Sequence, residues 1–405
     1  MSFGSFASFS QFYLYGRRHC TKTGYERARS AMLKKGADLL DSADLTDHVY
    51  IVTGANSGCG KEVARYLAER GATVNMFCRS AKRGEEARLA IVEASGNDKV
   101  FLRVCDVSLE ADVRKTWAEV AESTSRLDGL VCNAGVLLNE KTPTREGFET
   151  TFACHLLFGT YLLTNLAVPL LESTAGSRVV VVSSGGMYNT KWPAWGIATA
   201  QDGTYSGNLA YAYAKRGQVL LCERWSSMYP SVKFVSCHPG WTQTPAVDAA
   251  YDASTKKYLE PLRSPWEGAE GIAWLCAAPA DELVAGAFYL DRKVEPKHLA
   301  GPFFTEGSFT KNTPGEVDEM MARLEACTRG RRDGAIDDAE LAGAVARRTP
   351  LCERSMPINI ERFMGRWYAH PRPLPWYLPV AERRLCTHAA GTCSRRSRRR
   401  LTEVR

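Results

Sequence analysis

Short apolar runs alternate with longer helical patterns along most of the chain from residue 48 onward. Runs such as Val179 to Val182, apolar at every position, are typical of strands covered by helices on both faces. Seven runs of this kind are predicted strands, over residues 48–53, 73–78, 100–105, 127–132, 178–183, 232–238 and 287–290. The sequence therefore predicts an α/β fold, a doubly wound and parallel seven-stranded sheet with helices on both faces.

Four segments of different character divide the 405 residues. We expect an N-terminal helical extension over 1–46, the α/β domain over 47–310, a polar helical segment over 311–350 and a basic tail over 351–405. A chain of this length exceeds the size at which a single hydrophobic core usually stops growing. One large domain with appendages is the expected organisation.

The tail over 351–405 carries the positive charge of the chain. It holds twelve Arg, four Glu and no Lys or Asp, which more than accounts for the net charge of +7. A nucleic-acid-binding protein would display basic residues on its folded domain, so no nucleic-acid partner is expected. Residues 358–368, with Gly365 and Trp367, resemble the opening strand of lipocalins, but no further alternating runs follow. We interpret the tail as a truncated lipocalin-like strand in a largely disordered segment, with an exposed amphipathic strand as the alternative.

We expect a cytoplasmic protein without a secretory signal or a transmembrane segment. Residues 1–15 lack a basic start and a long apolar centre, and no stretch is expected to supply the ~20 apolar residues of a membrane span. An organelle address or a segment lying on a membrane surface is the alternative, since the first acidic residue is Glu26. The 13 cysteines are scattered through apolar runs, which favours reduced, buried thiols.

No metal site is expected. Asp333 to Glu340 resembles the second half of an EF-hand loop, but Arg329 and Arg331 stand at its first two ligand positions. Arginine cannot coordinate a calcium ion. The segment is therefore predicted to be the start of a solvated helix.

A glycine-rich loop follows the first predicted strand and precedes a predicted helix. Glycines allow the backbone to turn tightly and to lie against a pyrophosphate, which then rests on the amides of the helix N-terminus. An ordinary tight turn is the alternative, but the strand before and the helix after favour a Rossmann-type dinucleotide site. The candidate cofactor-binding residues of this loop are Thr53, Gly54, Asn56, Ser57, Gly58, Cys59 and Gly60.

The end of the second predicted strand favours NADP(H) over NAD(H). An NAD enzyme would place an acidic residue there, whereas this chain has Cys78 followed by Arg79. Arginine can pair with a 2′-phosphate, and Lys82 and Arg83 add positive charge; the alternative is that Arg79 is a surface residue. The ends of the third and fourth strands add further candidates for the cofactor site, namely Asp106, Val107, Asn133, Ala134 and Gly135.

Tyr211 and Lys215 are four residues apart, so they share one face of a predicted helix. A free tyrosine, with a pKa near ~10, is a poor base at neutral pH, and a nearby cation favours its phenolate form. This spacing alone is common by chance and more often marks a surface contact. Ser184, placed at the end of the fifth predicted strand where hydroxyls can point into a cleft, favours a catalytic pair.

In this order the glycine loop, Asn133-Ala134-Gly135, Ser184, Tyr211 with Lys215, and the segment from His238 to Thr244 resemble the motifs of the short-chain dehydrogenase/reductase superfamily. Within it, a narrower resemblance to one subgroup covers roughly residues 10–325. The resemblance implies that Tyr211 exchanges a proton with the substrate oxygen, that Lys215 favours its phenolate form and holds the nicotinamide ribose, and that Ser184 binds the substrate carbonyl. It also implies cofactor contacts from the turn after the sixth strand, at Pro239, Gly240, Thr242 and Thr244.

The same resemblance places the substrate between residues 187–209 and 246–265. Trp192, Trp195 and Trp266 suggest an apolar substrate, with core packing as the equal alternative. It further implies a homo-oligomer, although the N-terminal extension could block the usual helix pairing.

One residue departs from the superfamily pattern. Members usually carry an Asn in the helix after the fourth strand, where it supports a water relay to the lysine, and this chain has His155. An imidazole with a pKa near ~6.5 could relay protons itself, which would make His155 a fourth catalytic residue. It could also be a packed core histidine in a weakened enzyme.

Two functions follow from these observations. The first is an NADP-dependent oxidoreductase that interconverts an apolar or lipid-derived alcohol with its ketone or aldehyde. The second is an NADP-binding protein with little or no turnover, acting as a redox-responsive interaction module. The intact set of Ser184, Tyr211 and Lys215 favours the first, and His155 and the appended tail favour the second.

Overall fold

The computed structural model describes residues 3–34, 38–250, 252–301 and 304–348. Its contacts divide the chain into a unit over residues 1–350 and a second unit over 351–405. The basic tail and its lipocalin-like strand lie outside the described residues.

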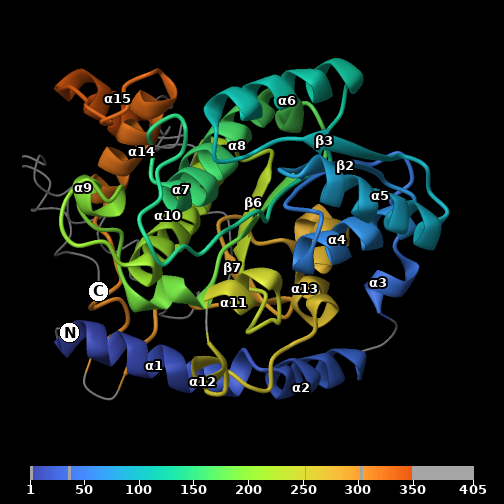
Figure 1. The fold of residues 1–405 in the computed structure, drawn as a ribbon, viewed down its shortest axis with the longest axis horizontal. Coiled ribbons are helices and arrows are strands. Elements are labelled where there is room, and N and C mark those ends of the chain that lie inside the picture. The colour runs from blue at the N-terminus through green and yellow to red at the C-terminus, as the bar shows by residue number, and fades with distance from the viewer. Residues whose placement is uncertain (1–2, 35–37, 251, 302–303, 349–405) are drawn as a thin grey trace, which may run out of the picture. The chain divides into compact units, whose positions relative to one another are not determined.

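An eight-stranded sheet lies at the centre of the first unit, in the order β3-β2-β1-β4-β5-β6-β7-β8 (Figure 1). The strands are β1 Val49–Thr53, β2 Thr73–Cys78, β3 Val100–Val104, β4 Gly129–Cys132, β5 Arg178–Val182, β6 Lys233–Cys237, β7 Phe288–Leu290 and β8 Lys293–Glu295. All residues of β1 and β5 are buried, as expected for strands covered on both faces. The predicted parallel sheet of seven strands is confirmed, and β8 adds an eighth strand antiparallel to β7.

Helices cover both faces of the sheet, as predicted. The helices over one face are α4 Gly58–Glu69, α5 Ala81–Ser95 and α13 Pro265–Ala277. Those over the other face are α6 Glu110–Ser123, α7 Thr150–Phe152, η1 Ala153–Leu162, α8 Leu163–Glu172 and α10 Gly207–Met228 (Figure 1). Two large apolar clusters, one on each face, form the core. The ten described cysteines are buried and free, which confirms the predicted reduced thiols for this part of the chain.

Strand order reverses between β1 and β4. The chain proceeds from β1 outward to β2 and β3, then returns to pair β4 with the other side of β1. In doubly wound sheets, ligands bind in the crevice at the carboxyl ends of the strands beside this reversal. The fold therefore places the glycine loop after β1 and the Asn133 turn after β4 at the same crevice.

The helix after β4 contains an unexpected π-helical stretch. α7, η1 and α8 run without a break over Thr150–Glu172, and η1 is π-helical. A Cβ on Gly159 would lie 2.0 Å from the carbonyl oxygen of Cys154, so only glycine fits this widened turn. By length and composition this helix is long and apolar enough to cross a membrane, although no such stretch was expected from the sequence. Its most apolar window is 78% buried inside the protein, because these side chains fill the core.

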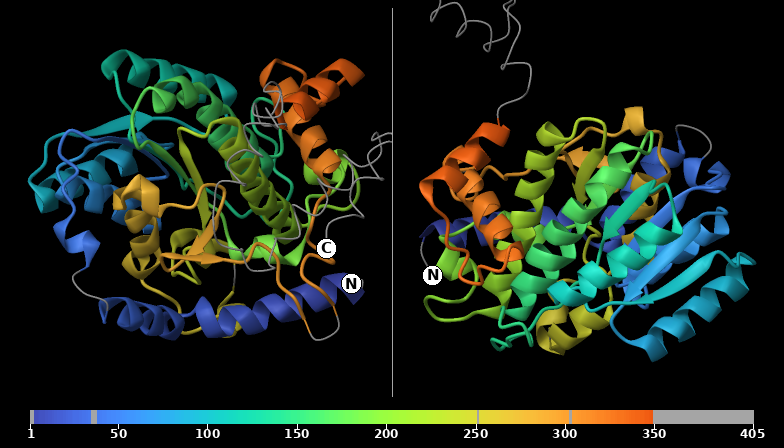
Figure 2. Two further views of the ribbon diagram at one scale, coloured as in Figure 1. Left: turned by 180° about the vertical axis from the view of Figure 1, so that it is seen from behind. Right: turned by 90° about the horizontal axis from the view of Figure 1, so that it is seen from above.

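The N-terminal extension forms α1 Phe3–His19, α2 Lys22–Leu33 and the short α3 Leu39–Ser42. Figure 1 and the left view of Figure 2 show α1 and α2 end to end along one side of the sheet domain. Near the C-terminus, α14 Pro314–Thr328 and α15 Asp338–Arg348 pack on each other, and α14 packs on η1. The remaining short helices are η2 Gly185–Asn189, α9 Trp195–Ala198, α11 Pro245–Ala250, α12 Ala253–Lys256 and η3 Ala280–Glu282.

Candidate active site

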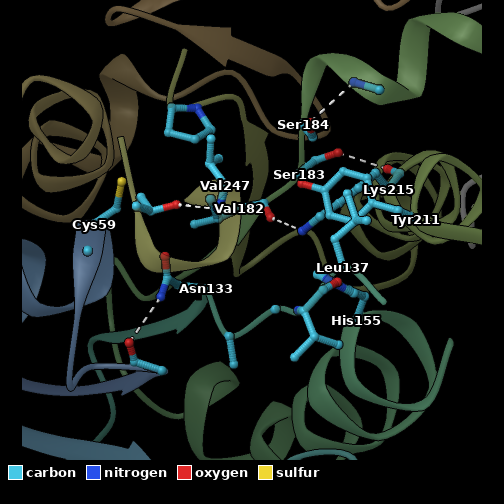
Figure 3. A pocket seen from close by; sticks show the side chains of 18 of the residues that line it. Cys59, Asn133, Leu137, His155, Val182, Ser183, Ser184, Tyr211, Lys215 and Val247 are labelled. Atoms are coloured by element: carbon cyan, nitrogen blue, oxygen red, sulfur yellow. Dashed lines mark hydrogen bonds between the residues drawn. The ribbon is translucent and has the colours of Figure 1, made fainter. Parts of the chain in front are cut away.

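A cavity of about 1540 Å³ opens at the carboxyl edge of the sheet. It is lined by every residue that the sequence predicts for the catalytic and cofactor sites except Thr53. Figure 3 shows Cys59 and Asn133 on one side of this cavity, and Ser184, Tyr211 and Lys215 on the other. The fold thus brings the glycine loop and the predicted catalytic residues to one space.

Thr53 does not line the cavity, but its hydrogen bonds hold residues that do. Its side chain is fully buried at the end of β1, and its hydroxyl oxygen accepts hydrogen bonds from the amides of Asn133 and Ala134, both at 2.9 Å. The Asn133 side-chain amide in turn donates to the Thr53 carbonyl at 2.9 Å. These bonds tie the turn after β4 to the end of β1.

The glycine loop forms a cradle in which the backbone itself is the surface. Gly54 and Gly58 have φ angles of 67° and 55°, in the left-handed region that favours glycine. A Cβ on Gly60 would lie 2.3 Å from the side-chain nitrogen of Asn133, so this position has no room for a side chain. Ser57 caps α4 without a side-chain hydrogen bond to its first amides. This open helix N-terminus suits the pyrophosphate of a dinucleotide.

Positive charge lies at the end of β2. Arg79, Ser80 and Arg83 line the cavity, and the Ser80 hydroxyl caps α5 by accepting from the Arg83 amide at 3.3 Å. Asp106 is the single carboxylate among the described residues that line the cavity. Both the amide and the hydroxyl of Ser108 donate to its Oδ1, at 3.0 and 2.7 Å. β2 therefore ends without the acidic residue that an NAD-dependent enzyme carries there. Arg79 and Arg83 lie at this end instead, and their positive charge suits the 2′-phosphate of NADP(H).

Tyr211 and Lys215 lie one turn apart on α10, and both line the cavity. The Lys215 ammonium donates to the carbonyl of Val182 at 2.7 Å, and lies 5.4 Å from the centre of the Tyr211 ring. Ser183, next to Val182, donates its hydroxyl to the Lys215 carbonyl at 2.8 Å. The end of β5 therefore holds the lysine in place beside the tyrosine, as Figure 3 shows.

Burial lowers the pKa of Lys215 to about 8, because its side chain is removed from water. The folded protein therefore releases this proton at a lower pH than the unfolded chain, whose lysine has a pKa near 10.5. Burial of the charged ammonium lowers the free energy of unfolding. This loss is complete below about pH 8, where Lys215 is charged in the folded protein, and it disappears as the pH approaches 10.5.

We predict that the free energy of unfolding of the wild type rises, relative to that of Lys215→Met, by about 3 kcal/mol between pH 8 and pH 10.5. Methionine keeps an unbranched chain of similar length but cannot carry a charge. Urea denaturation of both proteins over this pH range measures the difference. A difference that stays constant with pH would contradict the lowered pKa.

Ser184 lies directly after the residues that hold Lys215. Its Oγ accepts a hydrogen bond from the Gly186 amide at 3.2 Å, which caps η2. Because this bond uses an acceptor position, the hydroxyl proton is left to donate into the cavity that Ser184 lines.

His155 lies in the π-helical stretch and lines the cavity at 1% exposure. Its Nε2 is 2.9 Å from the amide nitrogen and 2.7 Å from the carbonyl oxygen of Val136, and the tautomer decides which bond forms. Burial, and then the charge of Lys215, lower the pKa of His155 well below its usual range. The imidazole is therefore neutral at pH 7. It packs edge-on against the Tyr211 ring, with the ring centres 5.2 Å apart.

Of the two alternatives for Trp192, Trp195 and Trp266, substrate contact and core packing, the structure shows core packing. Trp192 and Trp195 are buried in the core cluster that contains η1 and α14. Trp266 packs against α4, where Arg65 lies 5.5 Å over its ring. Trp241 lines the cavity instead.

One wall of the cavity was not predicted from the sequence. Phe9, Phe12 and Tyr13 of α1 line it, although they lie far from the predicted site in the sequence. Helical spacing of these aromatic residues was the available signal, but it does not show which surface the helix contacts. Two segments, residues 187–209 and 246–265, were expected to border the substrate. Part of each segment lines the cavity.

Comparison with known proteins agrees with this geometry. Residues 48–254 match the family model for short chain dehydrogenase. Dehydrogenase/reductase SDR family member 12 from Bos taurus is 36% identical over 78% of this chain and 95% of its own length. Retinol dehydrogenase 11 from Mus musculus is 30% identical over 64% of this chain and 82% of its own length.

A solved short-chain type dehydrogenase/reductase from Mycobacterium marinum has the same fold. It superposes with a TM-score of 0.50 at 21% identity, over 62% of this chain and 96% of that one. The family match covers the glycine loop, the turn after β4 and the tyrosine–lysine pair of α10. The chain therefore belongs to the short-chain dehydrogenase/reductase family, and is an oxidoreductase built on an NAD(P)-binding Rossmann fold.

Proposed function

We propose that the protein is an NADP(H)-dependent oxidoreductase that interconverts an apolar or lipid-derived alcohol with its ketone or aldehyde. The observation that carries this proposal is the meeting of Ser184, Tyr211 and Lys215 at the same cavity as a glycine cradle. Neither feature alone points to this chemistry, since glycine loops and tyrosine–lysine pairs occur widely.

The roles of the catalytic residues follow from their hydrogen bonds. In the direction of carbonyl reduction, Ser184 donates its free proton to the substrate oxygen, and the Tyr211 hydroxyl gives its proton to the same oxygen. The fixed Lys215 ammonium stabilises the phenolate that this leaves. When bound, a nicotinamide cofactor would supply hydride-transfer chemistry at the substrate carbon. A neutral His155 packed on the Tyr211 ring keeps the phenol in position.

The cofactor would lie along the carboxyl edge of the sheet. The glycine cradle and the start of α4 would hold the pyrophosphate, and the turns at Asp106 and Asn133 would border the adenosine and the ribose. Pro239, Gly240, Thr242 and Thr244 line the nicotinamide side of the cavity in this arrangement. A Cβ on Gly58 would lie 3.2 Å from Thr244, so the two ends of the site approach each other closely.

We predict that Arg79→Ala weakens NADPH binding about tenfold or more and leaves NADH binding within about twofold. A charge-assisted bond to the 2′-phosphate contributes roughly 1.5–3 kcal/mol, and NADH has no such phosphate. Lys82→Ala is the matched control, because Lys82 is a nearby basic residue that does not line the cavity. Quenching of nucleotide fluorescence measures both affinities. Equal weakening of NADPH and NADH would refute the role of Arg79.

The mouth of the cavity supports an apolar substrate. Phe9, Leu209 and Tyr258 line the cavity and are 52%, 46% and 66% exposed, so its rim is apolar. A relative that carries the name retinol dehydrogenase agrees with a lipophilic substrate. We further propose a cytoplasmic enzyme that contacts membrane surfaces through this rim, and that associates as a homo-oligomer.

A further inference from the structure

Helix α1 supplies a wall of the cavity that neither the cofactor cradle nor the catalytic residues explain. Phe9, Phe12 and Tyr13 line the cavity from this helix. Leu14, the next residue, does not line the cavity and is 65% exposed. Three aromatic side chains of α1 therefore face the cavity, whereas Leu14 faces away from it.

The contacts of α1 fix its position on the domain. A Cβ on Gly16 would lie 2.2 Å from the Trp241 ring, so the helix backbone rests directly on that side chain. The Trp241 amide donates to the Cys20 carbonyl at 2.7 Å, just past the end of the helix. The buried Arg263 donates to the carbonyls of His19 and Cys20, at 2.8 and 3.0 Å. A wall held in this way can shape a binding site.

The wall begins beside the reacting groups. A Cβ on Gly185, the residue after Ser184, would lie 2.3 Å from the Phe12 ring, so Phe12 covers the backbone next to the catalytic serine. The Phe12 ring meets Trp241 edge-on, with ring centres 6.2 Å apart, and Tyr13 stacks on Trp241, also at 6.2 Å. These three rings form a continuous aromatic surface.

The same surface reaches the rim of the cavity. The Tyr13 hydroxyl donates to the carbonyl of Tyr258 at 3.4 Å, and the Tyr258 side chain is exposed at the mouth. The cavity, at about 1540 Å³, exceeds the roughly 300–1,000 Å³ of a typical ligand pocket. It therefore has space for a bulky substrate beside a dinucleotide.

We propose that α1 is the substrate-binding wall, and that Phe12 and Tyr13 select substrates whose apolar body extends from the reacting carbonyl to the rim. The inference rests on the proposed function for the reaction at Ser184 and Tyr211. An apolar ligand can bind to this wall without being turned over, so ligand binding is tested separately from the reaction. Short carbonyl compounds would reach Ser184 without touching Tyr13.

The first test is binding of prodan, an apolar naphthyl ketone whose emission shifts to the blue in apolar surroundings, to the full chain saturated with NADP⁺. We expect Phe12→Ala and Tyr13→Ala each to weaken prodan binding about tenfold, because each removes a large apolar contact. NADPH affinity should stay within about twofold, and Leu14→Ala should change neither. Thermal melting identifies any variant that fails to fold, and Phe12→Leu and Tyr13→Leu then replace it. No prodan binding by the wild type, or equal weakening by Leu14→Ala, would overturn the inference.

The second test compares long and short substrates. With a series of straight-chain aldehydes, Tyr13→Ala should raise KM for the longest members about tenfold and leave kcat/KM for the shortest unchanged. Equal losses for all lengths would overturn the role of α1 and leave the proposed reaction standing. Prodan binding that depends on Tyr13, in a protein that turns over no carbonyl compound, would instead refute the proposed reaction and support the wall.

Discussion

Tyr211→Phe is expected to lower the rate of carbonyl reduction by about 10²–10⁴-fold while leaving NADPH affinity unchanged. The substitution removes the hydroxyl that gives its proton to the substrate oxygen, and general acid–base groups typically contribute 10²–10⁴-fold. It keeps the aromatic ring, which packs against His155 and lies 5.4 Å from the Lys215 ammonium. NADPH consumption followed by absorbance measures the rate, and nucleotide fluorescence measures the affinity.

Tyr213→Phe is the matched control for this prediction. Tyr213 lies two residues further along α10 and also lines the cavity, so its variant loses the same oxygen from the same helix. We expect it to keep wild-type turnover within a few fold. Comparable losses in the two variants would mean that Tyr211 has no special role in proton transfer.

Arg263→Ala is expected to lower the free energy of unfolding by about 3–5 kcal/mol. Arg263 is 1% exposed and forms a two-pronged ion pair with the buried Asp291, at 2.5 and 2.9 Å. Removing one partner of a buried pair leaves the other charge without compensation, which is strongly destabilising. The variant also loses the hydrogen bonds to the carbonyls of His19 and Cys20, which hold the end of α1.

Arg329→Ala provides the comparison for this stability change. Arg329 pairs with Glu325 at 2.6 Å, but its side chain is 64% exposed. Exposed pairs contribute at most about 1 kcal/mol, so this variant should be nearly as stable as the wild type. Urea denaturation measures both. A loss below 1 kcal/mol for Arg263→Ala would contradict its role as the anchor of α1.

The parts of the fold that the sequence predicted are those with strong local signals. Val179 to Val182 are apolar at every position because β5 is covered on both faces, and the glycine loop has no side chains where the backbone must turn. β8 was missed, because Lys293–Glu295 is three residues long, largely exposed and charged at both ends. The π-helical turn around Gly159 was missed as well, since an apolar stretch looks alike in either kind of helix.

The parts of the site that the sequence missed depend on contacts between distant segments. Phe9, Phe12 and Tyr13 of α1 face the cavity because Arg263 and Trp241, more than 200 residues away, hold that helix in place. Trp192, Trp195 and Trp266 did not indicate the substrate site for the same reason. A large aromatic side chain suits a core as well as a binding site: Trp192 packs in the core, whereas Trp241 lines the cavity.

The most direct test of the proposed reaction is consumption of NADPH by the purified full chain, with a panel of ketones and aldehydes of increasing apolar size. We expect NADPH to be oxidised with at least one bulky apolar member of the panel, and the reaction to disappear in Tyr211→Phe. NADPH that binds with the Arg79 dependence described above, yet is consumed with no member of the panel, would contradict the proposed reaction.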